Sequence, residues 1–283
     1  MFIQGNGRCL SLDKVRVMGI LNMTPDSFSD GGRFNGLDKA LFHAESMIAA
    51  GVDIIDIGGE STRPGAAEVS ELEELERVLP VIEKIVSRFD IFVSVDTSRP
   101  KVMTAAANAG VNLINDVRAL EVPGALQASA ATGLPVCLMH MRGSPVSMQN
   151  EPEYRDPVSD IIEYLQERVN ACLQAGIDAT RLLVDPGFGF GKTLDHNLAL
   201  LARLKEFKSL QLPVLVGMSR KTMIGDILNR PVSERMVGSV AAAVIAAMNG
   251  ADIVRVHDVK ESVEAIKVFN AQRPWQKQAG EVN

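Results

Sequence analysis

Residues 52–97 read VDIIDIGGESTRPGAAEVSELEELERVLPVIEKIVSRFDIFVSVDT, and the arrangement of apolar residues in this stretch determines the predicted fold. Two short aliphatic runs, 52–59 and 91–97, are typical of buried strands. The segment between them opens with a capping-box pair, Ser70 and Glu73, and continues with apolar residues three and four apart. These apolar positions are Leu72, Leu75, Leu79, Ile82 and Val86. The order strand, helix, strand predicts a parallel βαβ unit.

The same alternation continues in both directions along the chain. The predicted strands are 15–22, 52–59, 91–97, 112–117, 136–140, 182–187, 214–219 and 253–257. The 283 residues divided among eight units give about 35 residues per unit, close to the ~30 of one βαβ repeat. We therefore predict an α/β fold in which residues 1–283 form a single domain, a (β/α)₈ barrel, with residues 1–14 as a hairpin across its floor. A doubly wound open sheet is the alternative.

Polar residues lie at the carboxyl ends of these apolar strands. They are Asn22, Gly59 with Glu60, Asp96, Asn115 with Asp116, His140, Asp185, Ser219 and His257. Aliphatic side chains fill a barrel interior, so a polar ring at one rim predicts a solvent-facing site there. Asp, Asn and Ser also end strands because they start turns and cap helices, and Asp258 with Glu261 fits such a cap.

Three loops at this rim are unusual. Residues 19–34 and 56–70 combine paired glycines with prolines and hydroxyl side chains, which suits either a lid or a flexible connection. The segment DPGFGFGKT, residues 185–193, matches neither a phosphate loop nor a dinucleotide fingerprint. Its glycines can let the backbone approach a flat ligand, with Phe188 or Phe190 stacking on it and the Asp185 carboxylate accepting paired N–H donors.

Basic residues follow the last two predicted strands. Arg220 and Lys221 come after residue 219, and Arg255 and His257 alternate on the last strand. In barrels these loops frequently bind phosphate, so we expect an anionic group here. Arg255 can instead pair with a rim carboxylate, and Lys221 can instead form a Schiff base with a carbonyl substrate. His43 and His196 fall on predicted helices and have weaker claims.

Composition excludes several classes of protein. The chain is 46% hydrophobic and 23% charged, which excludes disorder, and its net charge of −6 argues against nucleic acid as a partner. Cys9, Cys137 and Cys172 are far apart and form no disulfide or zinc pattern, so a cytoplasmic location is expected. No export signal or apolar run of ~20 residues is present, so we expect no membrane association.

Eight motifs in one order are similar to those of a known family. They are GILNMTPDSFSDGG, DIGGESTRPGA, SVDTSRP, INDVR, LMHM, DPGFGFGK, GMSRK and RVHDV, within residues 15–270. This set resembles the bacterial dihydropteroate synthases, the folate-pathway enzymes that sulfonamides inhibit. The resemblance implies condensation of 6-hydroxymethyl-7,8-dihydropterin pyrophosphate with 4-aminobenzoate, which gives 7,8-dihydropteroate and pyrophosphate. It also implies a homodimer that forms through helices of the outer barrel wall.

The resemblance further implies three subsites and a magnesium ion. The pterin subsite is Asp96, Asn115, Met139, Asp185, Gly217, Lys221 and Arg255, of which Asp96, Asp185, Lys221 and Arg255 take part in the reaction. The pyrophosphate subsite is Asn22, Thr62, Arg63, Arg255 and His257, with Asn22 as the protein ligand of Mg²⁺. The aminobenzoate subsite is Phe28, Arg63, Pro64, Phe190, Ser219 and Lys221.

The expected chemistry is departure of pyrophosphate followed by attack of the amine, with no covalent enzyme nucleophile. Rim loops that close over the pyrophosphate would complete the aminobenzoate subsite, so we expect the pterin substrate to bind first. Three other readings stay open at this point: a cobalamin-linked methyltransferase barrel that shares the pterin pocket, a Schiff-base aldolase that uses Lys221, and a pterin-binding protein without catalytic activity.

Overall fold

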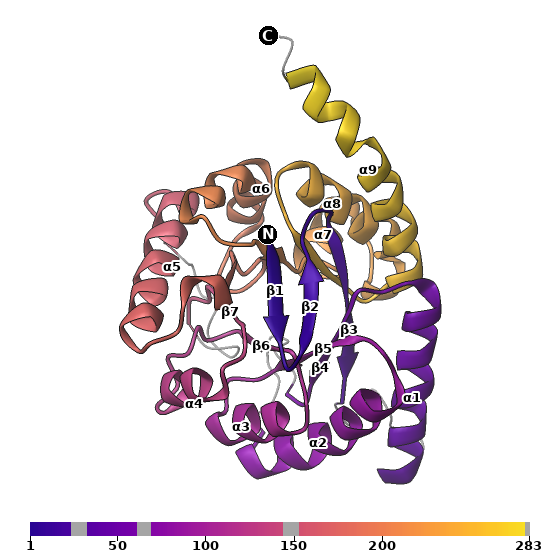
Figure 1. Ribbon diagram of the computed structural model, residues 1–283. Coiled ribbons are helices and arrows are strands. Elements are labelled where there is room, and N and C mark those ends of the chain that lie inside the picture. Colours follow the sequence, from indigo (N-terminus) through magenta and orange to yellow (C-terminus); the bar gives the residue numbers. More distant parts are fainter. Residues whose placement is uncertain (24–32, 61–68, 144–152, 281–283) are drawn as a thin grey trace.

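The computed structural model describes residues 1–23, 33–60, 69–143 and 153–280, and its centre is a sheet of eight parallel strands (Figure 1). These strands are β3 (Arg16–Asn22), β4 (Ile54–Gly58), β5 (Phe92–Asp96), β6 (Leu113–Asp116), β7 (Val136–Met139), β8 (Leu182–Asp185), β9 (Leu215–Val216) and β10 (Ile253–Val256). Each one lies within one of the eight ranges predicted from the sequence.

The sheet closes on itself. Its order is β8-β7-β6-β5-β4-β3-β10-β9, and a parallel bridge between Val184 of β8 and Val214, next to β9, joins the two ends. The backbone N–H of Val184 also donates to the carbonyl of Pro213 at 3.0 Å. A doubly wound sheet would leave two edges open, so this closure excludes that alternative, and the predicted (β/α)₈ barrel is confirmed.

Helices surround the barrel on its outside (Figure 1). They are α1 (Arg33–Ala50), α2 (Glu71–Arg88), α3 (Pro100–Asn108), α4 (Ala125–Thr132), α5 (Pro157–Gln174), α6 (Leu194–Ala202), α7 (Thr222–Leu228), α8 (Met236–Met248) and α9 (Val259–Gly280), with short 3₁₀ turns at Ala179–Arg181, Leu204–Leu210 and Val232–Glu234. Within the described ranges, none of these helices has the length and apolar character that a membrane span requires.

The predicted N-terminal hairpin is present and covers one end of the barrel. Its strands β1 (Phe2–Gly5) and β2 (Arg8–Ser11) pair antiparallel and cross in front of the barrel in Figure 1. Ile3 and Leu12 pack in one apolar cluster with a single inward residue from each barrel strand. The strand residues are Met18, Ile54, Phe92, Leu113, Cys137, Leu183, Leu215 and Ile253. This end is therefore filled, and only the carboxyl ends of the strands remain for chemistry.

Helix α2 begins where the sequence predicted, and its buried face agrees with the prediction in part. The Ser70 side chain accepts a hydrogen bond from the backbone N–H of Glu73 at 3.2 Å, while the Glu73 carboxylate pairs with Arg77 instead of closing the box. The predicted Leu72 is exposed. The buried residues are Glu74, Val78, Val81, Ile82 and Ile85. Ile82 was among the predicted apolar positions, and Leu75 and Val86 pack partly buried against the core, whereas the burial of the Glu74 carboxylate was not predicted.

Candidate active site

Along each barrel strand, every second side chain points inward. The first inward residues fill the end covered by the hairpin, and the inward residues that follow them lie toward the carboxyl rim. Asn22 lies opposite Gly58, and Gly58 lies opposite Asp96, in the registers of β3, β4 and β5. A Cβ atom on Gly58 would lie 3.4 Å from the Cβ of Asp96 and 3.6 Å from Oδ1 of Asn22. A methyl group at position 58 would therefore just touch both the Asn22 amide and the Asp96 side chain, so glycine keeps this small gap between them unfilled.

Arg255 is the electrostatic centre of this layer. Its Nε donates to Oδ2 of Asp56 at 2.6 Å, and its Nη2 donates to Oδ2 of Asp96 at 2.7 Å. Asn115 also donates to Oδ2 of Asp56, at 3.1 Å. One cation thus bridges two carboxylates that come from neighbouring strands. Of the two roles considered for Arg255, this ion pairing is the one present in the structure.

Burial acts strongly on the second carboxylate of this bridge, Asp96. Burial raises the pKa of Asp96 to about 7, although the Arg255 guanidinium pulls it down, and the nearby Asp56 carboxylate pushes it further up. The single positive charge of Arg255 does not fully offset the negative charges of both Asp56 and Asp96, so the pKa of Asp96 stays raised. The ionised form of Asp96 is the one that the ion pair with Arg255 requires.

Asp56 is the site residue that the sequence reasoning missed. It is fully buried, Oδ2 accepts both hydrogen bonds described above, and Oδ1 has no partner among the described residues. Its position inside the strand, four residues before the polar strand end at Glu60, kept it out of the predicted ring. The available signal was a charged residue in the middle of an otherwise aliphatic run, IIDIG, because such a charge must find a partner inside the barrel.

Asp185 and Lys221 lie on the opposite side of the rim. Oδ1 of Asp185 accepts from the backbone N–H of Gly187 at 2.7 Å, and burial raises the pKa of this carboxyl while Lys221 opposes the shift. Nζ of Lys221 donates to the carbonyl of Phe188 at 2.5 Å and lies 4.2 Å from the ring centroid of Phe190. Burial lowers the pKa of Lys221 to about 8.

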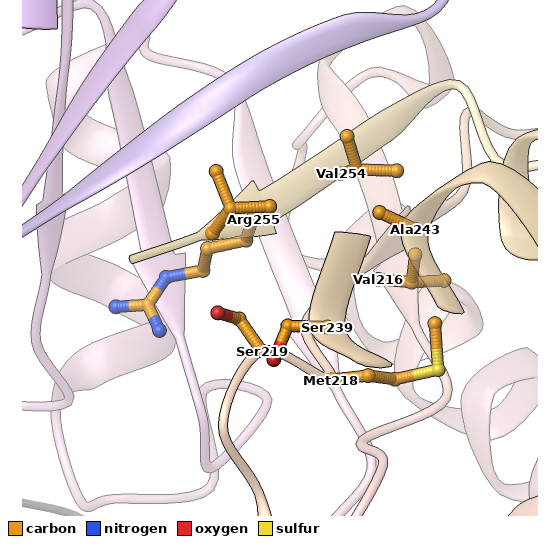
Figure 2. Close-up of a pocket in the computed structure, with 8 residues that line it drawn as sticks. Val216, Met218, Ser219, Ser239, Ala243, Val254 and Arg255 are labelled. Atoms are coloured by element: carbon orange, nitrogen blue, oxygen red, sulfur yellow. The ribbon is translucent and has the colours of Figure 1, made fainter. Parts of the chain in front are cut away.

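The remaining predicted residues of the described part also face this rim. The Ser219 hydroxyl lies 3.1 Å from Nδ1 of His257 and accepts from the backbone N–H of His257 at the same distance. Met139 packs with Phe190 and Val117 in a small apolar cluster. Figure 2 shows Ser219 below Arg255, whose guanidinium points away from the apolar wall that Val216 and Val254 form. Gly217 lies against Arg255: a Cβ atom added to Gly217 would be 3.6 Å from the Cβ of Arg255.

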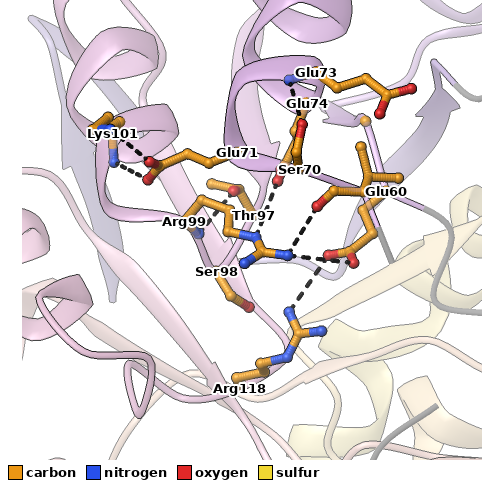
Figure 3. A network of polar contacts seen from close by, with 12 residues as sticks. Glu60, Ser70, Glu71, Glu73, Glu74, Thr97, Ser98, Arg99, Lys101 and Arg118 are labelled. Atoms are coloured by element: carbon orange, nitrogen blue, oxygen red, sulfur yellow. Dashed lines mark hydrogen bonds and ion pairs between the residues drawn. The ribbon is translucent and has the colours of Figure 1, made fainter. Parts of the chain in front are cut away.

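Four predicted residues lie outside the described ranges: Phe28, Thr62, Arg63 and Pro64. The residues on either side of positions 61–68 are described, and Arg99 contacts both of them. Nη2 of Arg99 donates to the carbonyl of Val69 at 2.9 Å and lies 4.0 Å from Oε1 of Glu60. The other carboxylate oxygen of Glu60, Oε2, lies 3.5 Å from Nη1 of Arg118 (Figure 3). Nε of Arg99 lies 4.0 Å from the buried carboxylate of Glu74.

Three expectations about rim residues need correction. Phe188 is fully buried in the main core and cannot stack on a ligand, which leaves Phe190. Asp116 points to the outside of the barrel and accepts from the backbone N–H groups of Arg118 and Leu120, so there the turn-forming explanation holds. Asp258 directly precedes α9, as predicted, but its carboxylate pairs with Arg220, so Arg220 is not an open phosphate ligand.

The glycines of residues 185–193 serve the protein's own packing. Gly187, with φ +70°, would place a Cβ 1.8 Å from the carbonyl oxygen of His140, and Gly191, with φ +65°, would place one 2.4 Å from that of Arg142. Both values are far below any tolerated contact. The close approach that the sequence assigned to a ligand is therefore an approach to the backbone that follows β7.

A magnesium ion could use Asn22 only together with ligands from a substrate. Within the described ranges, no group of three or more His, Cys, Asp or Glu side chains could hold a metal ion. The half-buried Asn22 amide offers one hard oxygen beside Gly58, which has no side chain to cover it. Mg²⁺ commonly binds through one or two protein oxygens plus substrate phosphates, so the residues present fit that mode.

The comparisons with known proteins agree with this geometry. A family model described as "Pterin binding enzyme" matches residues 18–257. The Escherichia coli K12 dihydropteroate synthase is 59% identical over 271 residues, which cover 96% of this chain and 95% of that protein. The crystal structure of the Yersinia pestis dihydropteroate synthase with a sulfonamide drug has a TM-score of 0.93 at 59% identity, covering 97% of this chain and 100% of that one.

A second solved structure is the Xanthomonas albilineans dihydropteroate synthase with 4-aminobenzoic acid. It has a TM-score of 0.91 at 48% identity and covers 96% of this chain and 99% of that one. Similarity at this level over nearly the whole length extends well beyond the eight motifs. The chain therefore belongs to the dihydropteroate synthase family of pterin-binding enzymes, which are transferases.

Proposed function

We propose that this chain joins 6-hydroxymethyl-7,8-dihydropterin pyrophosphate to 4-aminobenzoate, which yields 7,8-dihydropteroate and pyrophosphate. The observation that carries the proposal is the polar cluster at the barrel rim, in which Arg255 bridges Asp56 and Asp96. The names of the relatives, and the 4-aminobenzoic acid bound in the Xanthomonas structure, support the choice of substrates.

The pterin would bind within the polar layer. Asp96, Asn115 and Asp185 offer acceptors and an amide to the N–H groups of the ring, and a carboxylate that accepts paired N–H donors is a strong recognition element. Lys221 would donate to a ring acceptor, and Arg255 would stack over the ring. Met139 and Gly217 line the same space. Because ionised Asp96 is needed both for the ion pair and for accepting, pterin binding should weaken below about pH 7.

The diphosphate would lie above the pterin, at Asn22 and His257 together with Thr62, Arg63 and Arg255. Magnesium held by Asn22 and the diphosphate oxygens would supply neutralisation of the leaving group's charge. The chain's own contribution is cationic: guanidinium groups and the His257 imidazole would stabilise the charge that develops as the methylene C–O bond breaks. Arg255 would have to interact with the diphosphate in addition to its ion pairs with Asp56 and Asp96.

The aminobenzoate would lie against Phe190 and Ser219, with Phe28, Arg63, Pro64 and Lys221 completing the subsite. Pyrophosphate departs first, with the electron pair of the broken C–O bond. The amine nitrogen of aminobenzoate then forms the new bond to the methylene carbon and loses one proton. Electron density of the reduced pterin can stabilise the methylene cation, so no covalent enzyme intermediate is needed. Sulfonamides should compete for this subsite, as the drug complex of the Yersinia protein suggests.

The decisive assay measures pyrophosphate release with both substrates, and with each one omitted. Release that needs both is the expected result. Release without aminobenzoate, or methyl transfer to a cobalamin acceptor, would refute the proposal. The lowered pKa of Lys221 also suits a Schiff-base nucleophile, so borohydride treatment with carbonyl compounds is the matched test: covalent trapping at Lys221 would favour an aldolase. Binding of the pterin without turnover would indicate a silent binding protein.

We further propose that the chain forms a homodimer through the α7–α8 side of the barrel wall. Exposed apolar side chains gather there along α7, the following 3₁₀ turn and α8, and Val237 is 74% exposed. The others are Ile227, Leu228, Val232, Met236, Ile245 and Met248. A two-fold dimer would bury this patch against itself. Sedimentation analysis should find a dimer for the parent and a monomer for Val237→Glu; an unchanged dimer in that variant would rule out this surface.

Two further parts of the proposal concern the chain as a whole. We propose that residues 1–283 form one domain, because the Asn270 side chain of α9 exchanges two hydrogen bonds of 3.0 Å with the backbone of Val15 at the opposite end of the sequence. We propose a cytoplasmic location from the cysteine pattern, since Cys137 and Cys172 are buried and unpaired. Limited proteolysis that released a stable half of the chain would contradict the single domain.

A further inference from the structure

A buried lysine that the proposed mechanism does not use lies beneath the loop that follows β8. Lys192 is 3% exposed, and its Nζ contacts three acceptors: Nδ1 of His140 at 2.9 Å, the carbonyl of Gly187 at 2.7 Å and the carbonyl of Phe190 at 3.0 Å. Burial lowers the pKa of Lys192 well below its ordinary value, while the Asp185 carboxylate opposes the shift, so these three close acceptors matter for keeping the amino group in place. Such a complete set explains how a lysine can remain in the interior.

The imidazole partner of Lys192 is itself buried and neutral. Burial lowers the pKa of His140 to about 2, so its ring accepts at Nδ1 and carries its proton on Nε2. The ring is held by an edge contact with Tyr164, at 4.9 Å between ring centroids, and its backbone carbonyl meets Gly187. His140 therefore offers Lys192 an acceptor with a fixed position.

The loop that Lys192 holds carries groups of the proposed site. Residues 185–191 contain three glycines with positive φ, a backbone with little intrinsic preference for one conformation. Lys192 fixes this loop at the carbonyls of Gly187 and Phe190, and Asn197 fixes it at the backbone N–H of Gly189, at 2.8 Å. On its other side, the Lys221 ammonium rests on the Phe190 ring.

We propose that Lys192 is a positioning residue: its Nζ ties two carbonyls of the 185–191 loop to His140 and so places Phe190, and with it Lys221, for the substrates. The proposal rests on the proposed function, since Phe190 and Lys221 are taken to face the aminobenzoate and the pterin. Lys192 itself touches neither substrate in this scheme. Its role is to convert a glycine-rich turn into a rigid wall.

The test compares four variants with the parent. Lys192→Met keeps the length of the side chain and removes all three donors. His140→Leu removes the acceptor, whereas His140→Asn keeps an oxygen near the position of Nδ1. Lys260→Met, at an exposed lysine of α9, is the matched control for loss of a lysine. We expect the KM for 4-aminobenzoate to rise at least tenfold in Lys192→Met and in His140→Leu, with a smaller change in kcat.

His140→Asn should restore the KM to within about threefold of the parent, and Lys260→Met should leave it unchanged. A role in stability alone would lower the melting temperature of Lys192→Met without changing the KM of the folded protein, and that outcome would overturn the proposal. If Lys192→Met does not fold, the comparison of His140→Leu with His140→Asn decides, because equal KM values in these two variants would also overturn it.

A measurement without substrates separates this proposal from the proposed function. The backbone N–H of Phe190 donates to the carbonyl of Gly187 at 3.2 Å, so its hydrogen exchange reports on the turn. Exchange at Phe190 should accelerate at least tenfold in Lys192→Met and should be unchanged in Lys260→Met. If the parent shows no condensation but this acceleration is found, the proposed function fails while the positioning role stands. Unchanged exchange would refute the positioning role by itself.

Discussion

The buried carboxylate of Glu74 should make the protein less stable as the pH rises, and Glu74→Gln should remove this effect. Glu74 is fully buried on α2, where Nε of Arg99 lies 4.0 Å from its carboxylate. Burial raises its pKa from 4.5 to about 7, while a hydrogen bond from the Thr97 side chain lowers it; the Glu60 carboxylate adds to the rise, and Arg99 opposes it. Figure 3 shows Glu74, Glu60 and Arg99 close together.

The sign and size follow from proton linkage. Between about pH 4.5 and pH 7 the folded protein keeps a proton on Glu74 that the unfolded chain has released, so folding loses stability as the pH rises through this window. Each pKa unit is worth about 1.4 kcal/mol, so the penalty is roughly 3 kcal/mol at pH 8 and under about 1 kcal/mol at pH 5. A neutral glutamine carries no such penalty at either pH.

Urea unfolding of the parent and of Glu74→Gln at pH 5 and pH 8 measures this difference. The variant should gain roughly 3 kcal/mol over the parent at pH 8 and little at pH 5. Glu83→Gln, on the exposed side of the same helix, should behave as the parent at both values. Other groups with raised pKa, such as Asp96, remain in both proteins and cancel in the comparison. A variant that is less stable than the parent at pH 8 would refute the reasoning.

Three substitutions at the rim have equally specific outcomes. Asp56→Asn removes a charge that raises the pKa of Asp96, so the pH below which pterin binding weakens should move down from about 7; calorimetry from pH 5 to pH 8 checks this, and an upward shift would contradict it. Asp185→Asn should weaken pterin binding at least tenfold, and an unchanged affinity would remove Asp185 from the subsite. Arg255→Ala should weaken pyrophosphate binding and cost about 3–5 kcal/mol of stability, because two buried carboxylates lose their counter-ion; calorimetry with no loss of affinity would exclude its phosphate role.

The architecture could be read from the sequence because it depends on a regular pattern. Eight aliphatic runs alternate with longer amphipathic segments, and parallel strands joined by helices are the simple way to bury both. Even β9, which is only Leu215–Val216 in the structure, lies within the range predicted for it. The closing bridge between Val184 and Val214 joins residues 30 positions apart and has no local signal, yet it is what distinguishes a barrel from an open sheet.

The site was predictable where a polar residue ends a strand and unpredictable where a partner decides its role. Asp116 and Asp185 look alike in the sequence, but one turns outward to form a turn and the other faces the rim. Asp56 and Glu74 look like a strand residue and a helix surface residue. Both carboxyl groups are buried, and each is close to an arginine from a distant part of the chain: Asp56 pairs with Arg255, and Glu74 lies near Arg99.

The sequence by itself determined the order of elements and the rim that bears the polar groups, because spacing along a chain sets which face each side chain takes on a strand or helix. Closure of the sheet into a barrel was observed only in the tertiary structure. Only the tertiary structure decided which charges meet: Arg255 with Asp56 and Asp96, and Lys192 with His140 beneath the glycine-rich loop. Local periodicity contains no information about such pairs. The electrostatic energy of a buried charge depends on the distance to its oppositely charged partner, and the closed barrel determines that distance.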